Sequence, residues 1–133
     1  MTSMYSGTSN KTFTDAPTDE SLTGLLSRAF SQPLALLGQS DASLSTWSVF
    51  WCVAANEGST QVTVAERCNL SPKTVSRVIA QLGESSTGRG WIRQSGDRTD
   101  RRVKRLSLTG EGRLVLRQML NDLRNPGFVS PPR

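Results

Sequence analysis

The chain has 133 residues, 35% of them hydrophobic, and a net charge of +5. This length suits one domain, and no stretch approaches the roughly 20 apolar residues that a membrane-spanning helix needs. The sequence contains no histidine, which removes the most common general base and metal ligand. It also shows no paired carboxylates and no nucleophile–base set. We therefore expect no enzyme, cofactor, metal site or membrane association. Since the chain does not start with a basic segment followed by an apolar run, we expect it to be cytoplasmic.

The charge is distributed unevenly along the chain. Residues 67–117 contain 12 of the 16 Lys and Arg residues but only four of the 11 acids, so this segment carries +8 and the remainder −3. A basic half joined to an acidic half indicates a surface that faces a polyanion. The alternative is an ordinary solvated, charged face.

The N-terminal third predicts an arm followed by a helix. Residues 1–18 are rich in Ser and Thr and are expected to be disordered. A cap at Thr18 with acids in the first turn then predicts a helix, which Pro33 ends or kinks. Apolar side chains recur along this helix at helical spacing, namely Leu22, Leu25, Leu26, Ala29 and Phe30.

The next helix is expected over 44–56, capped by Ser43 or Ser45. Its apolar stripe is Leu44, Trp47, Trp51 and Ala54, with Phe50 and Val53 beside it. This aromatic content, with that of Trp91, is typical of a central core element. Cys52 and Cys68 have neither a metal-ligand nor a redox-pair spacing, so we interpret both as small buried residues. A thiol sensor is the alternative.

Two short helices follow in immediate succession. Thr63-x-x-Glu66 has the pattern of a capping box, and Asn69-Leu70 is expected to form a turn. Ser71 then caps a second helix that reaches Leu82, with Pro72 at its first position. The spacing of Val75, Val78, Ile79 and Leu82 predicts its buried face. Its other faces carry Lys73, Thr74, Ser76, Arg77 and Gln81 and no acid, which suits the approach of a nucleic acid.

A basic hairpin and a final helix complete the domain. Strands are expected on either side of a tip at 97–102, which carries Arg98, Arg101 and Arg102. Thr109 to Gly112 starts the last helix, whose predicted apolar stripe is Leu116, Met119, Leu120 and Leu123. Residues 125–133 are expected to form a flexible tail. The predicted fold class is therefore α+β and mainly helical: a winged helix-turn-helix over 19–124, with a two- to three-stranded antiparallel wing sheet.

Two motifs closely resemble those of MarR-type transcriptional regulators. One is Asp100-Arg101-Arg102, followed by a basic strand and by Leu108-Thr109-Gly-Glu-Gly112-Arg113. The other is the run from Val64 to Ile79. The resemblance covers roughly residues 43–124. It implies that helix 71–82 reads the major groove and that a wing arginine, Arg102 with Arg101 and Arg98 as neighbours, enters the minor groove. Asp100 is expected to orient an arginine.

The resemblance also implies a homodimer, with 19–38 and 110–124 as possible dimerisation helices. The short last helix and Pro33 predict smaller dimer arms than those of relatives. They also weaken the small-molecule pocket that relatives form, so an effector is left open.

The predicted DNA contacts follow from these two reading elements. Arg77 is expected at guanine, with a plain surface arginine or a phosphate contact as the alternative. The capping role of Ser71 is by itself enough to explain that residue. Arg89, Arg93, Lys104 and Arg105 are expected to touch phosphates or to raise the local field. The complete set of predicted DNA-binding residues is Ser71, Lys73, Thr74, Ser76, Arg77, Gln81, Arg98, Arg101, Arg102 and Lys104.

The leading functional hypothesis is a sequence-specific regulator that binds double-stranded DNA and acts as a repressor. Two alternatives stay open. One is an accessory DNA-binding winged-helix protein of a plasmid or virus, with a role in replication, segregation or transfer. The other is a protein-interaction module that has kept the fold and lost DNA binding.

Overall fold

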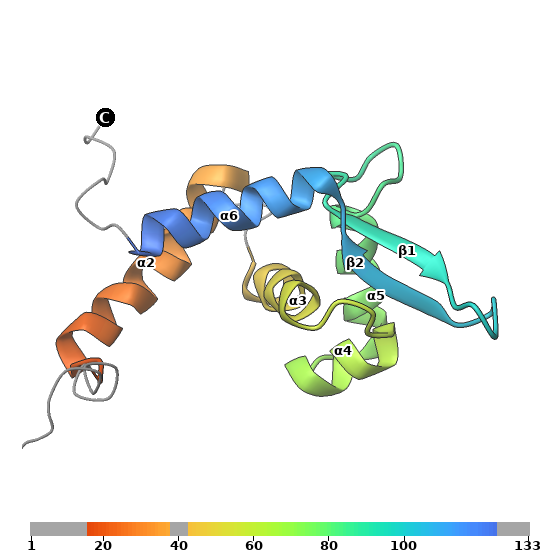
Figure 1. The fold of residues 1–133 in the computed structure, drawn as a ribbon, viewed down its shortest axis with the longest axis horizontal. Coiled ribbons are helices and arrows are strands. Elements are labelled where there is room, and N and C mark those ends of the chain that lie inside the picture. The colour runs from red at the N-terminus through yellow and green to blue at the C-terminus, as the bar shows by residue number, and fades with distance from the viewer. Residues whose placement is uncertain (1–15, 38–42, 125–133) are drawn as a thin grey trace, which may run out of the picture.

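The computed structural model describes residues 16–37 and 43–124, so nearly all of the predicted N-terminal arm and the whole predicted tail lie outside the described residues. The described elements confirm the predicted α+β winged helix-turn-helix. In chain order (Figure 1) they are α2 (Asp19–Leu37), α3 (Leu44–Ala55), α4 (Gln61–Cys68), α5 (Pro72–Leu82), β1 (Ile92–Gly96), β2 (Lys104–Leu108) and α6 (Gly110–Arg124).

The sheet is a single antiparallel hairpin. Ile92 lies opposite Leu108 at its base, and Gly96 lies opposite Lys104 near its tip. A third chain segment joins β2 at Leu106, whose N–H donates to the Ser59 carbonyl at 2.8 Å and whose carbonyl accepts from the Gly58 N–H at 2.7 Å. Of the two predicted sheet sizes, the structure therefore has two strands, with isolated bridges at Ser59 and at Gly83.

The core is built around α3, which packs against α4, α5 and β2. Its centre is aromatic, as predicted: the ring centroids of Trp47 and Phe50 lie 5.1 Å apart, and those of Phe50 and Trp91 lie 5.7 Å apart. Both pairs have the edge-to-face geometry that aromatic rings prefer. Valines and leucines from α5 and β2 surround them, including Val75, Val78, Leu82, Leu106 and Leu108.

The predicted apolar stripe of α3 was wrong at one end. Leu44 is 62% exposed, whereas Thr46 and Val49 are buried. Leu44 is the first residue of the helix, directly after the Ser43 cap. Because no helical turn precedes Leu44, its side chain is not covered from that side and lies at the margin of the core. The burial of α3 on several sides gives it a wider buried arc than one stripe.

The predicted capping box of α4 was also wrong. The helix begins at Gln61, and the Thr60 hydroxyl caps it by accepting from the Thr63 N–H at 3.2 Å. Glu66 is exposed and lies in the second turn. Thr60 and Thr63 are both good caps. The pairing of Ser59 with Leu106 holds the chain extended up to Thr60, so the helix starts at the earlier of the two.

Helix α2 continues through Pro33 to Leu37, so of the two effects predicted for Pro33, an end or a kink, the structure rules out the end. An internal proline costs about 3 kcal/mol, and here the burial of its ring offsets part of this cost. The helix also packs against α6, where Arg28 donates to the Leu123 carbonyl at 3.3 Å. No helix in the described part of the chain is long and apolar enough to cross a membrane.

Helix α6 is anchored where it leaves the sheet. The Thr109 hydroxyl donates to the Gly90 carbonyl at 2.6 Å and accepts from the Gly112 N–H at 3.0 Å. This cap brings Gly112 so close to the Trp91 backbone that a Cβ there would lie 2.2 Å from the Trp91 carbonyl oxygen. The Thr109–Gly112 pair therefore fixes the direction in which α6 leaves the wing.

Candidate nucleic-acid interface

Helix α5 presents a polar, acid-free face to solvent. The Ser71 hydroxyl accepts from the Thr74 N–H at 3.1 Å and so caps the helix, with Pro72 in its first turn. Val75, Val78, Ile79 and Leu82 are buried as predicted. Lys73, Ser76 and Arg77 are exposed on the other side. The sequence of α5 contains no Asp or Glu, so nothing on the helix repels a phosphate backbone.

Three residues of α5 lie where the sequence did not place them. Gln81 accepts a hydrogen bond from the Thr46 hydroxyl at 3.2 Å, which directs it toward α3 and away from the exposed face. Thr74 is half-buried and hydrogen-bonded to Ser71. Ala80 is exposed three residues after Arg77. Ala80 follows Ser76 and Arg77 by four and three residues, so helical spacing alone would have placed it on the same face. The Ala80 methyl group can contact the methyl group of a thymine.

The wing tip is held by one carboxylate. Asp97 Oδ2 accepts from the Thr99 hydroxyl at 2.6 Å, from the Thr99 N–H at 3.0 Å and from the Asp100 N–H at 3.2 Å. The Asp97 N–H donates to the Val103 carbonyl at 2.8 Å and closes the loop. The tip is therefore an ordered turn that can present its arginines in fixed positions.

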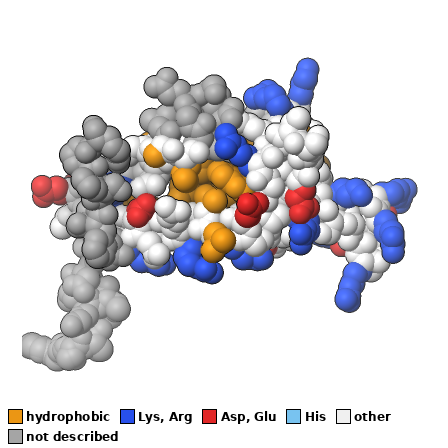
Figure 2. All heavy atoms as spheres, turned by 90° about the horizontal axis from the view of Figure 1, so that it is seen from above, with side chains coloured by type: hydrophobic (Ala, Val, Ile, Leu, Met, Phe, Trp, Pro, Cys, Tyr) orange, Lys and Arg blue, Asp and Glu red, His pale blue; other side chains and the backbone are white. Residues whose placement is uncertain are grey.

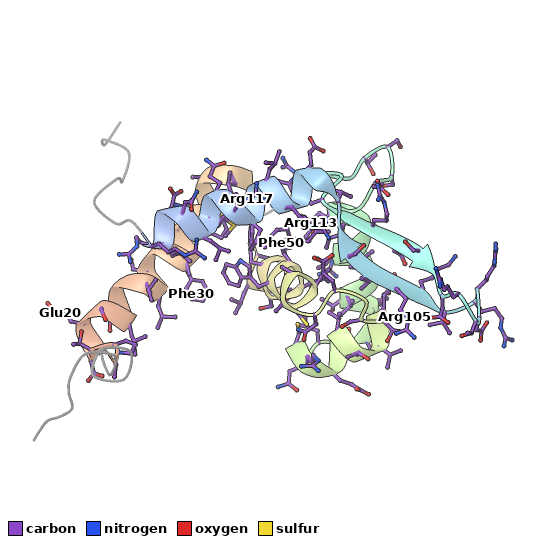
Figure 3. The ribbon with its side chains drawn as sticks, in the orientation of Figure 1. Glu20, Phe30, Phe50, Arg105, Arg113 and Arg117 are labelled. Atoms are coloured by element: carbon purple, nitrogen blue, oxygen red, sulfur yellow. The ribbon has the colours of Figure 1, made fainter. Side chains whose placement is uncertain are left out.

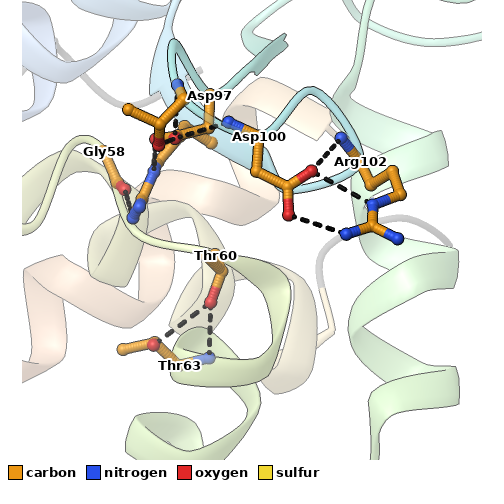
Figure 4. Close-up of polar contacts among 8 residues, drawn as sticks. Gly58, Thr60, Thr63, Asp97, Asp100 and Arg102 are labelled. Atoms are coloured by element: carbon orange, nitrogen blue, oxygen red, sulfur yellow. Dashed lines mark hydrogen bonds and ion pairs between the residues drawn. The ribbon is translucent and has the colours of Figure 1, made fainter.

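Asp100 orients an arginine, as predicted, and that arginine is Arg102. Its Nε donates to Asp100 Oδ1 at 3.1 Å, and its terminal nitrogen donates to Oδ2 at 3.3 Å (Figure 4). These contacts hold the pKa of Asp100 below its usual range. The Arg102 side chain is still 90% exposed. The guanidinium is therefore braced on one edge and open to a ligand on the others.

Arg105 holds the wing to the body of the domain. Its Nε donates to Asp97 Oδ1 at 2.9 Å, and another of its nitrogens donates to the Gly58 carbonyl at 3.1 Å. Arg93 is likewise paired with Glu84 at 3.1 Å, and Arg113 with Glu57 at 2.8 Å. Arg105 and Arg93 were predicted to touch phosphates or to raise the local field. The structure pairs each of them with an acid eight or nine residues away in the sequence, and their contact with phosphates stays a prediction.

Several exposed cations lie at the end of the molecule that carries the wing, and others lie along its length. Figure 2 shows Lys and Arg side chains projecting around that end. Within residues 16–37 and 43–124, the ion pairs of the structure include none of the predicted contact residues Lys73, Arg77, Arg98, Arg101 and Lys104. All five are exposed. The wing and α5 also belong to one body, because Gly83 at the end of α5 bridges Ile92 of β1, and Gln61 of α4 donates to Gln94 at 3.1 Å.

The pH dependence of the wing follows from Asp97. The Thr99 hydroxyl and the Arg105 guanidinium hold the pKa of Asp97 well below its usual range. A carboxyl with a lowered folded-state pKa stabilises the fold fully above its unfolded value of about 3.9, and this contribution is lost as the pH falls through the folded value. We expect the Thr99 amide resonance to stay unchanged from neutral pH to about pH 4 and to shift only in stronger acid. The variant Asp97→Asn should lack this acid transition, and a Thr99 shift between pH 7 and 5 would contradict the assignment.

The chain is similar to known proteins in its structure, whereas searches with its sequence find no match. No protein-family profile and no curated protein sequence matches the chain. Among solved structures, the PcaV transcriptional regulator from Streptomyces coelicolor is 25% identical, with 82% of this chain and 79% of that chain aligned at a TM-score of 0.54. FabT of Streptococcus pneumoniae, solved in complex with DNA, is 19% identical over 86% of this chain and 81% of that one, with a TM-score of 0.54. The transcriptional regulator Tm0710 from Thermotoga maritima reaches a TM-score of 0.62 at 14% identity, over 80% of this chain and 72% of that one.

The chain has the MarR-type winged-helix fold. The resemblance seen in the wing sequence is thereby confirmed at the level of the fold. In this MarR-type domain, residues of the wing motif have structural roles. Asp100 holds the Arg102 side chain, Thr109 caps α6, and Gly112 allows α6 to approach the Trp91 backbone closely. The sequence motif therefore encodes the shape of the wing and of the joint behind it.

Proposed function

We propose that this protein binds double-stranded DNA at specific sequences and acts there as a transcriptional repressor. Helix α5 would enter the major groove, and the wing tip would enter the adjacent minor groove. The observation that carries the proposal is the pairing of an acid-free, exposed α5 face with a wing whose Arg102 is braced and still 90% exposed. An arginine held outward in this way suits a narrow minor groove, where the negative potential is enhanced.

The exposed residues divide into two roles. Lys73, Ser76, Arg77 and Ala80 would meet base edges and the flanking phosphates from α5, with Arg77 as the guanine reader. Arg98, Arg101 and Lys104 would neutralise phosphates beside Arg102 and supply affinity without sequence preference. The Ser71 and Thr74 hydroxyls hydrogen-bond to each other at the start of α5. A phosphate would therefore be bound there by a backbone N–H of the first turn. Gln81 has no part in this proposal, because it is bonded to Thr46.

We further propose that two copies associate through α2 and α6. Leu22, Leu26 and Phe30 are 42%, 60% and 52% exposed and recur every fourth residue along α2. Their spacing makes them an apolar stripe, and Phe30 and the turns before it lie on the part of α2 that extends away from the domain body (Figures 1 and 3). Exposed apolar stripes of this kind mark interaction surfaces. A second copy would cover the stripe and place two reading helices on half-sites about one helical turn of DNA apart.

The test is capture and sequencing of fragmented genomic DNA by the purified protein, followed by titration of the recovered site at increasing salt. We expect a palindromic site that overlaps a promoter and an affinity that falls steeply with salt, since several phosphates are neutralised. Sedimentation of the complex should give two protein chains per site. A recovered site remote from any promoter would favour the accessory plasmid or viral role. Salt-independent binding, or no binding at low salt, would overturn the proposal.

A further inference from the structure

Helices α3 and α4 each carry one of the two cysteines of the sequence, Cys52 and Cys68. Both thiols are free, and both side chains are half-buried at the surface of the core. The two helices pack directly on each other. Residues that are 16 positions apart in the sequence thus lie across one helix–helix contact, where a small apolar side chain would have been enough for packing.

The geometry brings the two thiols together. The Cys68 thiol donates to the Ser48 carbonyl at 3.5 Å, and Ser48 lies one turn before Cys52 in α3. The side-chain amide of Asn56, one turn after Cys52, lies 3.9 Å from the Cys52 sulfur. Burial, and then the charge and hydrogen bond of the neighbouring Cys52, raise the pKa of Cys68 to about 11. Cys68 therefore stays protonated at neutral pH, whereas the Cys52 sulfur lies beside a side-chain N–H donor, that of Asn56.

We propose that Cys52 and Cys68 form a reversible intramolecular disulfide that links α3 to α4 when the protein meets a hydroperoxide. The Cys52 sulfur attacks the peroxide and becomes a sulfenic acid, with release of water or, from an alkyl hydroperoxide, an alcohol. The Cys68 sulfur then displaces the hydroxyl group, which leaves as water together with the Cys68 proton. The two thiols lose two electrons, and the peroxide accepts them.

The position of Cys68 determines the consequence of this bond. A disulfide holds its sulfurs about 2.05 Å apart, closer than any non-bonded contact, so its formation requires that the two side chains rotate or that the end of α4 moves toward α3. Cys68 is the last residue of α4, and Asn69, with a φ of 58°, turns the chain directly toward the Ser71 cap of α5. Any shift at Cys68 is therefore passed to the first turn of α5, where Lys73 lies. The effect on DNA rests on the proposed function, whereas the disulfide itself does not.

The test compares reduced, peroxide-treated and re-reduced protein with the variants Cys52→Ser and Cys68→Ser. Peptide mass mapping of the wild type should show the peptides of Cys52 and Cys68 joined, with loss of the two thiol hydrogens. The affinity for the recovered DNA site should fall roughly tenfold on oxidation, within the usual range of coupling between sites, and recover with a thiol reductant. Neither serine variant should cross-link internally or change its affinity on treatment.

The outcomes separate the two proposals. Oxidation of a single cysteine without an internal link, or only intermolecular links, would overturn the disulfide. A disulfide that leaves both the DNA affinity and the hydrogen exchange of the α5 amides unchanged would overturn its coupling to the reading helix. If the reduced protein binds no DNA, the proposed function fails, but mass mapping and hydrogen exchange still decide the disulfide and its effect on α5.

Discussion

Truncation of Arg102 to alanine is expected to weaken DNA binding by about 1–3 kcal/mol, which is roughly fivefold to more than a hundredfold. The side chain is 90% exposed, and Asp100 holds it through two hydrogen bonds. Its conformational freedom is thus restricted before DNA arrives, which lowers the entropic cost of binding. The loss should be similar for different DNA sequences, and the salt slope of binding should fall by about 0.9 if a phosphate contact is lost with it.

Two further variants make this expectation specific. Arg117→Ala removes the same charge from α6, at a site far from the wing (Figure 3), and should leave the affinity nearly unchanged. Arg77→Ala, on the exposed face of α5, should instead relax the sequence preference at one base pair. Fluorescence titration of the three variants on the recovered site and on a scrambled duplex measures both effects. An equal loss for Arg102→Ala and Arg117→Ala would show that net charge, and not the wing contact, drives binding.

Replacement of Gly112 by alanine is expected to destabilise the fold by about 3 kcal/mol, the upper end of the usual cost of overpacking. The added Cβ would lie 2.2 Å from the Trp91 carbonyl oxygen and 3.0 Å from its carbon. Both are backbone atoms, so no side-chain rotation can relieve the clash. Either α6 must move away from the sheet or the Thr109 cap must break, and both changes would disturb the joint between the wing and α6.

The matched control is Gly110→Ala, two residues earlier in the same helix. A Cβ at Gly110 meets nothing within 4 Å, so this variant should be neutral or stabilised by up to about 1 kcal/mol through the lower backbone entropy of alanine. Urea unfolding followed by tryptophan fluorescence compares the two, with Trp91 itself among the reporters. Equal stabilities for the two variants would mean that α6 does not approach Trp91 as closely as the structure indicates.

The sequence by itself determined the elements whose signals are local. The Ser71 cap, Pro72 and the buried spacing of Val75, Val78, Ile79 and Leu82 predict α5 correctly, because a helix is specified by contacts between residues three and four apart. The hairpin and the bracing of an arginine by Asp100 were also predictable, since Asp100 and Arg102 are two residues apart.

Only the tertiary structure decided the features that depend on distant partners. The start of α4 at Gln61 depends on the pairing of Ser59 with Leu106, and the continuation of α2 through Pro33 depends on its burial and on packing against α6. The sequence shows 12 basic residues in 67–117, but not that Arg93 and Arg105 pair with Glu84 and Asp97 while Arg102, paired with Asp100, keeps its side chain 90% exposed. A cation meets whichever acid the folded chain brings within about 4 Å, and that choice is made by contacts between elements rather than by neighbours along the chain.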